Sequence, residues 1–188
     1  MNVQASLNAL AESLKGQDEE YIETHAFKST QPVTTNDVEE AAKRLGQAIP
    51  PSLGEAMIAH GAFTLGDACP ATDSMSYKSW PPSEWRLALD YYADVFLGCD
   101  PDPEEVADEA GMEADDVAVL SQIVLIGLEG DEDYIGFDLR TRAADEECTF
   151  HVMLFEDSEI EEIAGEKPER QKGPGYDKWL AKHIEDRS

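Results

Sequence analysis

Basic residues are scarce in this chain of 188 residues. Its 14 Lys and Arg stand against 41 Asp and Glu, which gives a formal net charge of −27 at pH 7. The imbalance is greatest from Leu87 to Leu139, a segment with 16 Asp and Glu and no Lys or Arg. A surface of this sign repels phosphates, so we expect no direct binding to DNA, RNA or anionic lipid. Two interpretations of the acidity stay open: it attracts a basic protein partner, or it only keeps the protein soluble, as in a salt-adapted proteome.

Cysteines and long apolar runs are few as well. Cys69, Cys99 and Cys148 are odd in number and widely spaced, with no Cys-x-x-Cys pair. This usage predicts a reducing cytoplasm with free or buried thiols, and it argues against a disulfide framework or a zinc site. No apolar run approaches the roughly 18 residues of a transmembrane helix. The first residues, from Met1 to Lys15, also lack the basic start of a signal peptide. We therefore expect a cytoplasmic protein.

The clearest structural signal is a pair of strands between Gln122 and Arg140. Its first half, Ile123 to Leu128, is a nearly continuous apolar run, which predicts a strand buried on both faces. Its second half, Tyr134 to Leu139, alternates between apolar and polar residues, which predicts a strand with one wet or partly covered face. A third strand is expected at Thr149 to Phe155. Together they predict an antiparallel sheet.

Helices are expected on both sides of these strands in the sequence. We predict one single α+β domain over residues 34–188, with helices packed against a mainly antiparallel sheet and a C-terminal helix, and a helical extension over residues 1–33. Lys28 to Val33 is interpreted as a linker and residues 62–82 as a loop. The predicted helices are Val3 to Leu14, a possible second piece within Gln17 to Phe27, a helix capped by Asn36 and ended by Gly46, a helix from Pro51 or Ser52 to Gly61, a helix from Glu84 to Leu97 capped by Ser83, a short helix around Val106, and a last helix from Tyr176.

The order of these parts resembles a known superfamily. One helix ends in Arg44-Leu45-Gly46, and the next helix begins with the segment Ile49-Pro50-Pro51-Ser52-Leu53. The hairpin with the acidic turn follows later in the chain, from Ile123 to Asp138, and the last helix contains Trp179-Leu180. In this order the chain is similar to the SUKH superfamily over about residues 34 to 184. It departs from the family at His60-Gly61-Ala62, where an Asn-Gly-Gly-like turn is usual, and in a longer acidic insertion.

The resemblance implies a binding module that is not an enzyme. Many members of the superfamily are bacterial immunity proteins, and others regulate cell-wall synthesis in yeast. We therefore expect an immunity protein that binds and neutralises a cognate bacterial toxin domain, a basic nuclease-type toxin, by covering its functional surface. The alternative is an intracellular regulatory or scaffold protein of the same fold with another protein partner. No cofactor is expected, and the chain is expected to be a monomer or a weak homodimer.

The residues that we predict to contact the partner are acidic, with one tryptophan. The acidic residues come from the insertion after the third long helix and from the turn of the hairpin, where a glycine separates closely spaced carboxylates. Exposed carboxylates attract a basic partner, and an aromatic side chain beside them is typical of an interface hot spot. The predicted residues are Asp100, Asp102, Glu104, Glu105, Asp108, Glu109, Asp115, Asp116, Glu129, Asp131, Glu132, Asp133 and Trp80.

Other interpretations of these residues stay open. The hairpin carboxylates could bind a metal ion or simply be solvated, although an EF-hand loop from Asp131 fails because Ile135 and Arg142 occupy two of its ligand positions. Trp80 and Trp85 could both be core residues, and for Trp85 the core is favoured. No His-Glu-x-x-His, Gly-x-Ser-x-Gly or phosphate-binding glycine loop occurs. Two catalytic alternatives stay open: a hydrolase that uses paired carboxylates and a metal-dependent enzyme.

Overall fold

A computed structural model describes residues 3–66, 77–130, 133–143, 145–153, 155, 157–165 and 175–185. In this part of the chain the centre is one antiparallel sheet of seven strands. Its order is β1-β2-β3-β5-β6-β7, and the short β4 pairs with β5 next to the end of β3. The strands are β1 Phe27–Gln31, β2 Ala62–Leu65, β3 Tyr77–Ser79, β4 Arg86–Leu87, β5 Ile123–Glu129, β6 Asp133–Asp138 and β7 Thr149–Met153. The predicted α+β class with an antiparallel sheet is confirmed.

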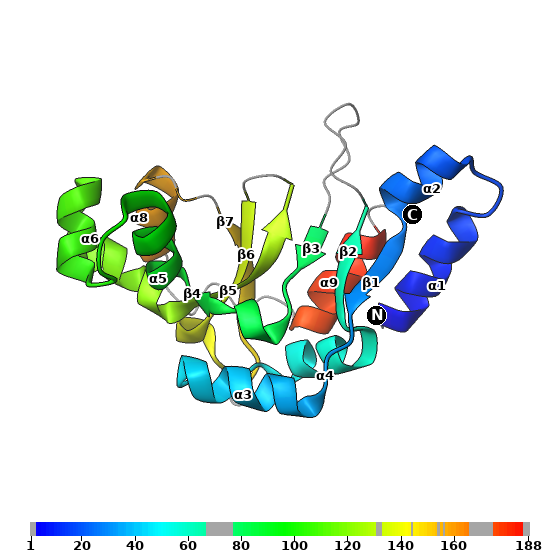
Figure 1. Cartoon of the computed structure of the whole chain (residues 1–188), viewed down its shortest axis with the longest axis horizontal. Helices are drawn as coiled ribbons and strands as arrows, with labels where there is room; N and C mark the ends of the chain where they lie inside the picture. The colour runs from blue at the N-terminus through cyan, green and yellow to red at the C-terminus, as the bar shows by residue number, and fades with distance from the viewer. Residues whose placement is uncertain are drawn as a thin grey trace.

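Helices surround this sheet on several sides. Figure 1 shows α1 and α2 at one end of the molecule, α6 and α8 at the other end, and α3 and α4 along one side of the sheet. The helices are α1 Val3–Ser13, α2 Glu19–His25, α3 Thr35–Leu45, α4 Pro51–His60, α5 Ala88–Tyr92, α6 Pro103–Ala110, α7 Ala114–Val117, α8 Asp157–Gly165 and α9 Tyr176–Glu185, with short helical turns η1 Pro82–Glu84, η2 Ala93–Leu97, η3 Ala118–Gln122 and η4 Leu139–Thr141. Of the turns, η2 is π-helical and the other three are 3₁₀ helices.

The core is built on β5, as the sequence predicts. Its residues from Ile123 to Ile126 are at most 1% exposed, because the strand has neighbours on both edges and is covered on both faces. Helix α9 covers one face: the ring of Trp179 meets the ring of Tyr77 edge to face, with centroids 5.4 Å apart. The hydroxyls of Tyr77 and Tyr176 lie 2.7 Å apart and form a buried hydrogen bond. Helix α9 is therefore fixed to the sheet by apolar and polar contacts together.

Helix α5 contributes to the opposite face of the sheet. Tyr134 on β6 lies in register with Leu128 on β5, which is in register with Lys78 on β3. Because side chains alternate along a strand, these residues point away from the face that carries Tyr77. On that second face the ring of Tyr134 packs against Tyr91 of α5, with centroids 5.0 Å apart. The two faces thus have different cover, α9 on one and the α5 region on the other.

Two segments that the sequence assigned to linker and loop are strands. Lys28 to Val33 was expected to be a linker, and this prediction is wrong because Phe27–Gln31 pairs with β2 as an edge strand. The sequence shows no apolar alternation here, because only Phe27 faces the core and the other positions of β1 are exposed and polar. The loop predicted over 62–82 is also wrong at β2 and β3, two short strands that meet in the sheet. Residues 67–76 of that range lie outside the described residues.

Helix starts were predicted less well than helix ends. Helix α3 is capped by Thr34, which forms a capping box with Asp37, so the cap predicted at Asn36 is wrong by two residues. The long helix predicted from Glu84 is wrong in its first part, where Trp85 follows η1 and β4 precedes α5. The helix α8 was not predicted. Gly46 ends α3 as expected. The second helical piece expected within Gln17 to Phe27 is α2, which begins after Asp18.

Gly61 ends α4 and also brings two chain segments together. Its φ is +76°, which side chains rarely tolerate, and a Cβ at this position would lie 2.3 Å from the carbonyl oxygen of Gln31. Only glycine therefore lets the end of α4 pass beside the end of β1. This close approach sets where β2 enters the sheet next to β1.

Candidate partner-binding surface

The acidic insertion folds into a compact helical arm, which we define as residues 100–116. Helix α6 begins there because the Asp102 side chain accepts hydrogen bonds from the backbone N–H groups of Glu104 and Glu105, at 3.0 and 3.3 Å. Pro103 occupies its first position, and Gly111 ends it with a φ of +73°. The short helix α7 follows at once. The acidic arm is therefore ordered by capping residues within its own sequence.

The apolar residues of the acidic arm face the core, so its carboxylates face outward. Val106 is 0% and Ala107 is 4% exposed, and Val117, directly after the arm, is 0% exposed. In the described part of the chain, none of the observed ion pairs includes a residue of the arm. Seven of the predicted contact residues are exposed and Asp116 is half-buried: the exposed ones are Asp100, Asp102, Glu104, Glu105, Asp108, Glu109 and Asp115.

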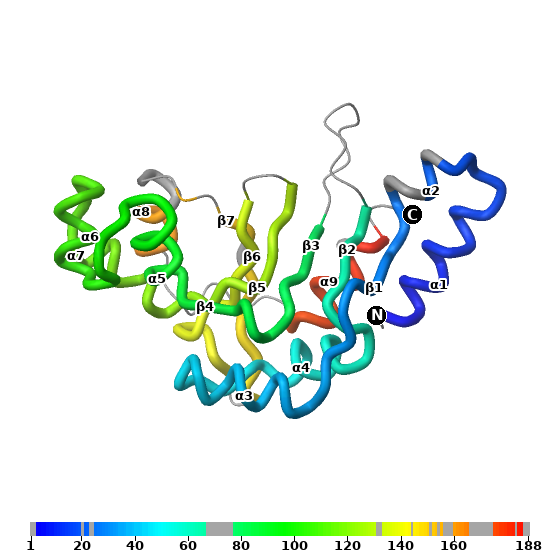
Figure 2. The backbone as a smooth tube through the Cα atoms, in the orientation of Figure 1, coloured from blue at the N-terminus to red at the C-terminus, as the bar shows by residue number. Residues whose placement is uncertain are grey.

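The hairpin carboxylates form a separate group with a different environment. Glu129 is 5% exposed, because β5 continues one residue beyond the apolar run and pairs it with Asp133. The expectation that Glu129 belongs to an exposed tip is therefore wrong. Asp133 is half-buried, and Asp131 and Glu132 lie outside the described residues. Figure 2 shows α6 and α7 at one end of the molecule and strands β5 and β6 near its middle, so the described hairpin residues and the acidic arm belong to separate parts of the fold.

Trp80 lines a surface pocket but is itself mostly covered. The pocket has a volume of about 490 Å³, and Trp85, Arg86 and Tyr91 also line it. The Trp80 side chain is 8% exposed, and Trp85 is fully buried, with its indole N–H donating to the Trp80 carbonyl oxygen at 2.9 Å. The interpretation of Trp85 as a core residue is confirmed. The role of Trp80 in partner binding stays a prediction.

An aromatic cluster connects this pocket to the start of the acidic arm. It was not predicted from the sequence. Phe155, just after β7, stacks on Tyr91 and on Tyr92, with ring centroids 5.8 and 5.2 Å apart. Phe96 of η2 completes the cluster at 5.4 Å from Phe155. The guanidinium of Arg86 lies 4.7 Å from the centroid of the Tyr91 ring. The spacing of the aromatic residues from Tyr91 to Phe96 was visible in the sequence, but their partner after β7 was not.

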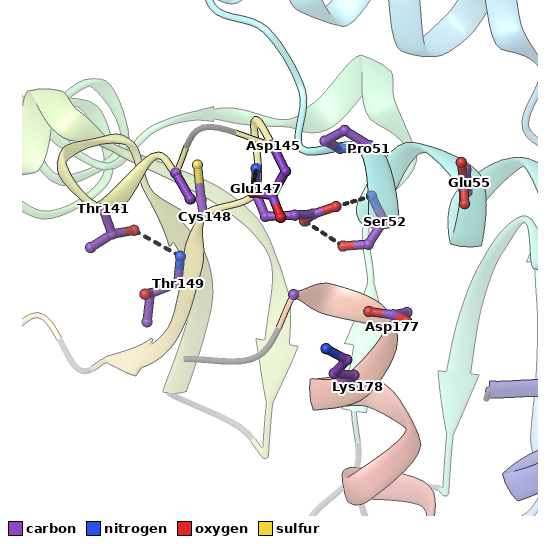
Figure 3. A pocket seen from close by; sticks show the side chains of 12 residues that line it. Pro51, Ser52, Glu55, Thr141, Asp145, Glu147, Cys148, Thr149, Asp177 and Lys178 are labelled. Carbon is purple, nitrogen blue, oxygen red and sulfur yellow. Dashed lines mark hydrogen bonds between the residues drawn. The ribbon is translucent and has the colours of Figure 1, made fainter. Parts of the chain in front are cut away.

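A second pocket, of about 410 Å³, lies where α4, β7 and α9 meet (Figure 3). Two of its polar residues, Ser52 and Glu147, form structural hydrogen bonds. The backbone N–H and the hydroxyl of Ser52 donate to the two carboxylate oxygens of Glu147, at 2.8 and 2.6 Å. The same hydroxyl accepts a hydrogen bond from the backbone N–H of Tyr176. Cys148 is 3% exposed, and burial raises the pKa of its thiol to about 11, so the thiol is protonated at neutral pH. Ser52 and Glu147 thus join the starts of α4 and α9.

Neither a metal centre nor a membrane span is found within the ranges that the structure describes. There, no three His, Cys, Asp or Glu residues gather closely enough to hold a metal ion. No helix in these ranges is long and apolar enough to cross a membrane.

Comparison with known proteins leaves the family open. No family model matches the chain, and no curated protein or solved structure matches it either. The similarity to the SUKH superfamily, which rests on the motifs quoted above, stays a prediction.

Proposed function

We propose that this protein is an immunity protein that binds a basic toxin domain through its acidic arm. The observation that carries the proposal is the state of the arm's carboxylates: all but the half-buried Asp116 are exposed, and the sequence from Leu87 to Leu139 contains no Lys or Arg to neutralise them. Their charge is therefore available to a partner. The quoted motifs that resemble the SUKH superfamily point in the same direction.

The arm presents its carboxylates on an ordered backbone. A backbone that is already ordered before binding loses less conformational entropy when the complex forms. Here the α6 backbone is fixed by the Asp102 cap at its start and by the buried Val106 side chain at its centre. The carboxylates of α6 are consequently presented on a preformed helix instead of on a mobile loop.

The proposed mechanism is occupation of a phosphate-binding surface. A nuclease binds nucleic acid through Lys and Arg side chains, and these side chains are also able to pair with carboxylates. An acidic arm seated on that surface excludes the nucleic acid without any chemical step. Complementary charge also speeds the encounter of two proteins, which suits an inhibitor that must reach a toxin before the toxin reaches its substrate. Toxin–immunity pairs of other folds reach Kd values on the order of 10⁻¹³ M.

The test compares two variants with the same change of net charge. In the arm variant, four exposed acids of α6 become amides: Glu104→Gln, Glu105→Gln, Asp108→Asn and Glu109→Gln. In the matched control, four exposed acids elsewhere become Gln: Glu19, Glu39, Glu40 and Glu55. The ligand is the product of the adjacent gene, which we expect to contain the toxin domain, and its association rate is measured at low and at high salt.

We expect the arm variant to associate roughly tenfold more slowly than the parent at low salt, with a weaker dependence on salt concentration. The control variant should show a smaller loss, because its charges lie farther from the binding surface. Equal losses in both variants would mean that only the net charge matters, and unchanged rates in the arm variant would place the binding surface elsewhere.

A further inference from the structure

Two large apolar side chains stand exposed next to each other on η2. Val95 is 52% exposed and Phe96 is 49% exposed, and they are the two most exposed large hydrophobic residues in the described part of the chain. Exposure of apolar side chains to water is unfavourable in free energy. An exposed apolar patch is therefore a feature of binding sites. The turn that carries them is π-helical, a form that occurs often at functional sites.

The local structure holds this apolar pair in place. The N–H of Gly98 donates to the carbonyl oxygen of Ala93 at 2.7 Å and closes the turn, and Ala93 itself is 0% exposed. The ring of Phe96 packs against Tyr92 and Phe155, with centroids 5.6 and 5.4 Å apart. One side of Phe96 is therefore fixed by the aromatic cluster while the other faces solvent. A partner would meet an ordered apolar contact.

Carboxylates stand on both sides of the pair in the chain. Asp94 precedes Val95, is exposed, and binds Arg86 at 2.8 Å. After the pair, the pKa of the Cys99 thiol is raised by its burial and by the nearby carboxylates of Glu105, Glu109 and Asp100. The acidic arm begins at Asp100, three residues after η2 ends at Leu97, and α6 packs against η2. The apolar pair thus lies at the junction between the aromatic cluster and the acidic arm.

We propose that Val95 and Phe96 form the apolar anchor for a cationic, amphipathic segment of a partner protein. An apolar centre with a charged rim is the arrangement of an interface hot spot. The charge of the rim selects a partner segment in which an aliphatic or aromatic side chain is flanked by Lys or Arg. A second copy of this chain is a poor occupant, because it would bring another net charge of −27. Val95 and Phe96 would belong to the same binding surface as the acidic arm, so this inference rests on the proposed function.

The test uses a short helical peptide with Leu along one face and Lys on the others, and a second peptide of equal charge in which Ser replaces each Leu. Binding to the full chain is measured by titration calorimetry at two salt concentrations. The variants are Val95→Ser and Phe96→Ser. Ile58→Ser is the matched control, because Ile58 is 43% exposed and lies on α4, away from the arm. Thermal unfolding of each variant checks the fold, and Val95, which has no ring to contribute to the cluster, keeps the test valid if Phe96→Ser unfolds.

We expect the Leu-containing peptide to bind more tightly than the Ser-containing one, and Val95→Ser to weaken that binding by about tenfold. Ile58→Ser should leave it unchanged. Equal binding of both peptides, or equal effects of the Val95 and Ile58 substitutions, would contradict the apolar anchor. Binding would then be explained by attraction between opposite charges alone. That result would leave the proposed immunity function in place, because binding to the product of the adjacent gene tests that function separately.

Discussion

Glu147 holds the start of α4 through Ser52, a residue 95 positions earlier in the chain. Its two carboxylate oxygens accept the backbone N–H and the hydroxyl of Ser52, and the hydroxyl oxygen accepts the N–H of Tyr176 at the start of α9. The first N–H groups of a helix have no partner within it, and an anion near them is stabilising. One carboxylate and one hydroxyl therefore join the beginnings of two helices to the segment before β7.

Removing Glu147 should destabilise this junction. We expect Glu147→Ala to lower the free energy of unfolding by about 1.5–3 kcal/mol, the usual contribution of a hydrogen bond to a charged group. Ser52→Ala should cost about 1–2 kcal/mol, and the double variant should cost less than the sum, because the two residues share one interaction. Urea unfolding measures all three. Glu55→Ala is the control, since Glu55 is exposed in the same pocket; strictly additive losses would mean that the two residues act independently.

Arg140 is expected to matter more than any surface cation. It forms a forked contact with Asp138, which is 0% exposed, and it donates to the carbonyl oxygen of Ile163 near the end of α8. Arg140→Ala leaves a buried carboxylate without this partner, so we expect a loss of about 3–5 kcal/mol. Arg140→Lys should recover only part of it, because an ammonium group cannot form the fork.

The control for Arg140 is Lys15→Ala, which removes an exposed ion pair with Glu12. Such pairs contribute roughly 0–1 kcal/mol. Thermal and urea unfolding of these variants are compared under the same conditions. A loss at Arg140 no larger than the loss at Lys15 would contradict the role assigned to the buried pair.

The start of α3 offers a direct comparison between two candidate caps. The Thr34 hydroxyl accepts a hydrogen bond from the N–H of Asp37, whereas the side-chain amide of Asn36 donates to Glu40 on the surface of the helix. We expect Thr34→Ala to cost about 1 kcal/mol and Asn36→Ala only a few tenths. The reverse order in urea unfolding would show that Asn36 is the cap.

The Thr34 contribution should also depend on pH. Hydrogen bonds from the Thr34 hydroxyl and backbone N–H lower the pKa of Asp37 in the folded protein. A lowered folded pKa gives stability that is present above the unfolded pKa, about 3.9 for aspartate, and is lost as the pH falls through the folded value. The difference in stability between the parent and Thr34→Ala should therefore shrink below about pH 4. A difference that stays constant into acid would rule out this linkage.

The sequence predicts those elements whose pattern is set by burial on a regular period. The apolar run from Ile123 identifies β5, and the helical spacing of Leu180 and Ile184 identifies α9, because both elements pack fully against the core. It fails at β1, where pairing is through the backbone and the side chains are exposed. It also fails at Thr34, since Thr and Asn are both good caps and only the start of the helix decides between them.

The candidate surface was predictable in its charge and less so in its shape. Exposure of the acidic arm follows from the polar residues around the buried Val106. The burial of Glu129 does not, because it depends on β5 extending past the apolar run to pair with Asp133. The aromatic cluster joins Tyr91 to Phe155, which are distant in sequence, so only the folded chain brings them together.

The most direct test of the central claim is a growth measurement in bacteria that express the product of the adjacent gene, which we expect to be a toxin. We predict that co-expression of this chain restores growth, that the two proteins purify as one complex, and that the arm variant protects less well than its charge-matched control. Continued killing in the presence of the folded chain, with no complex recovered, would contradict the immunity function.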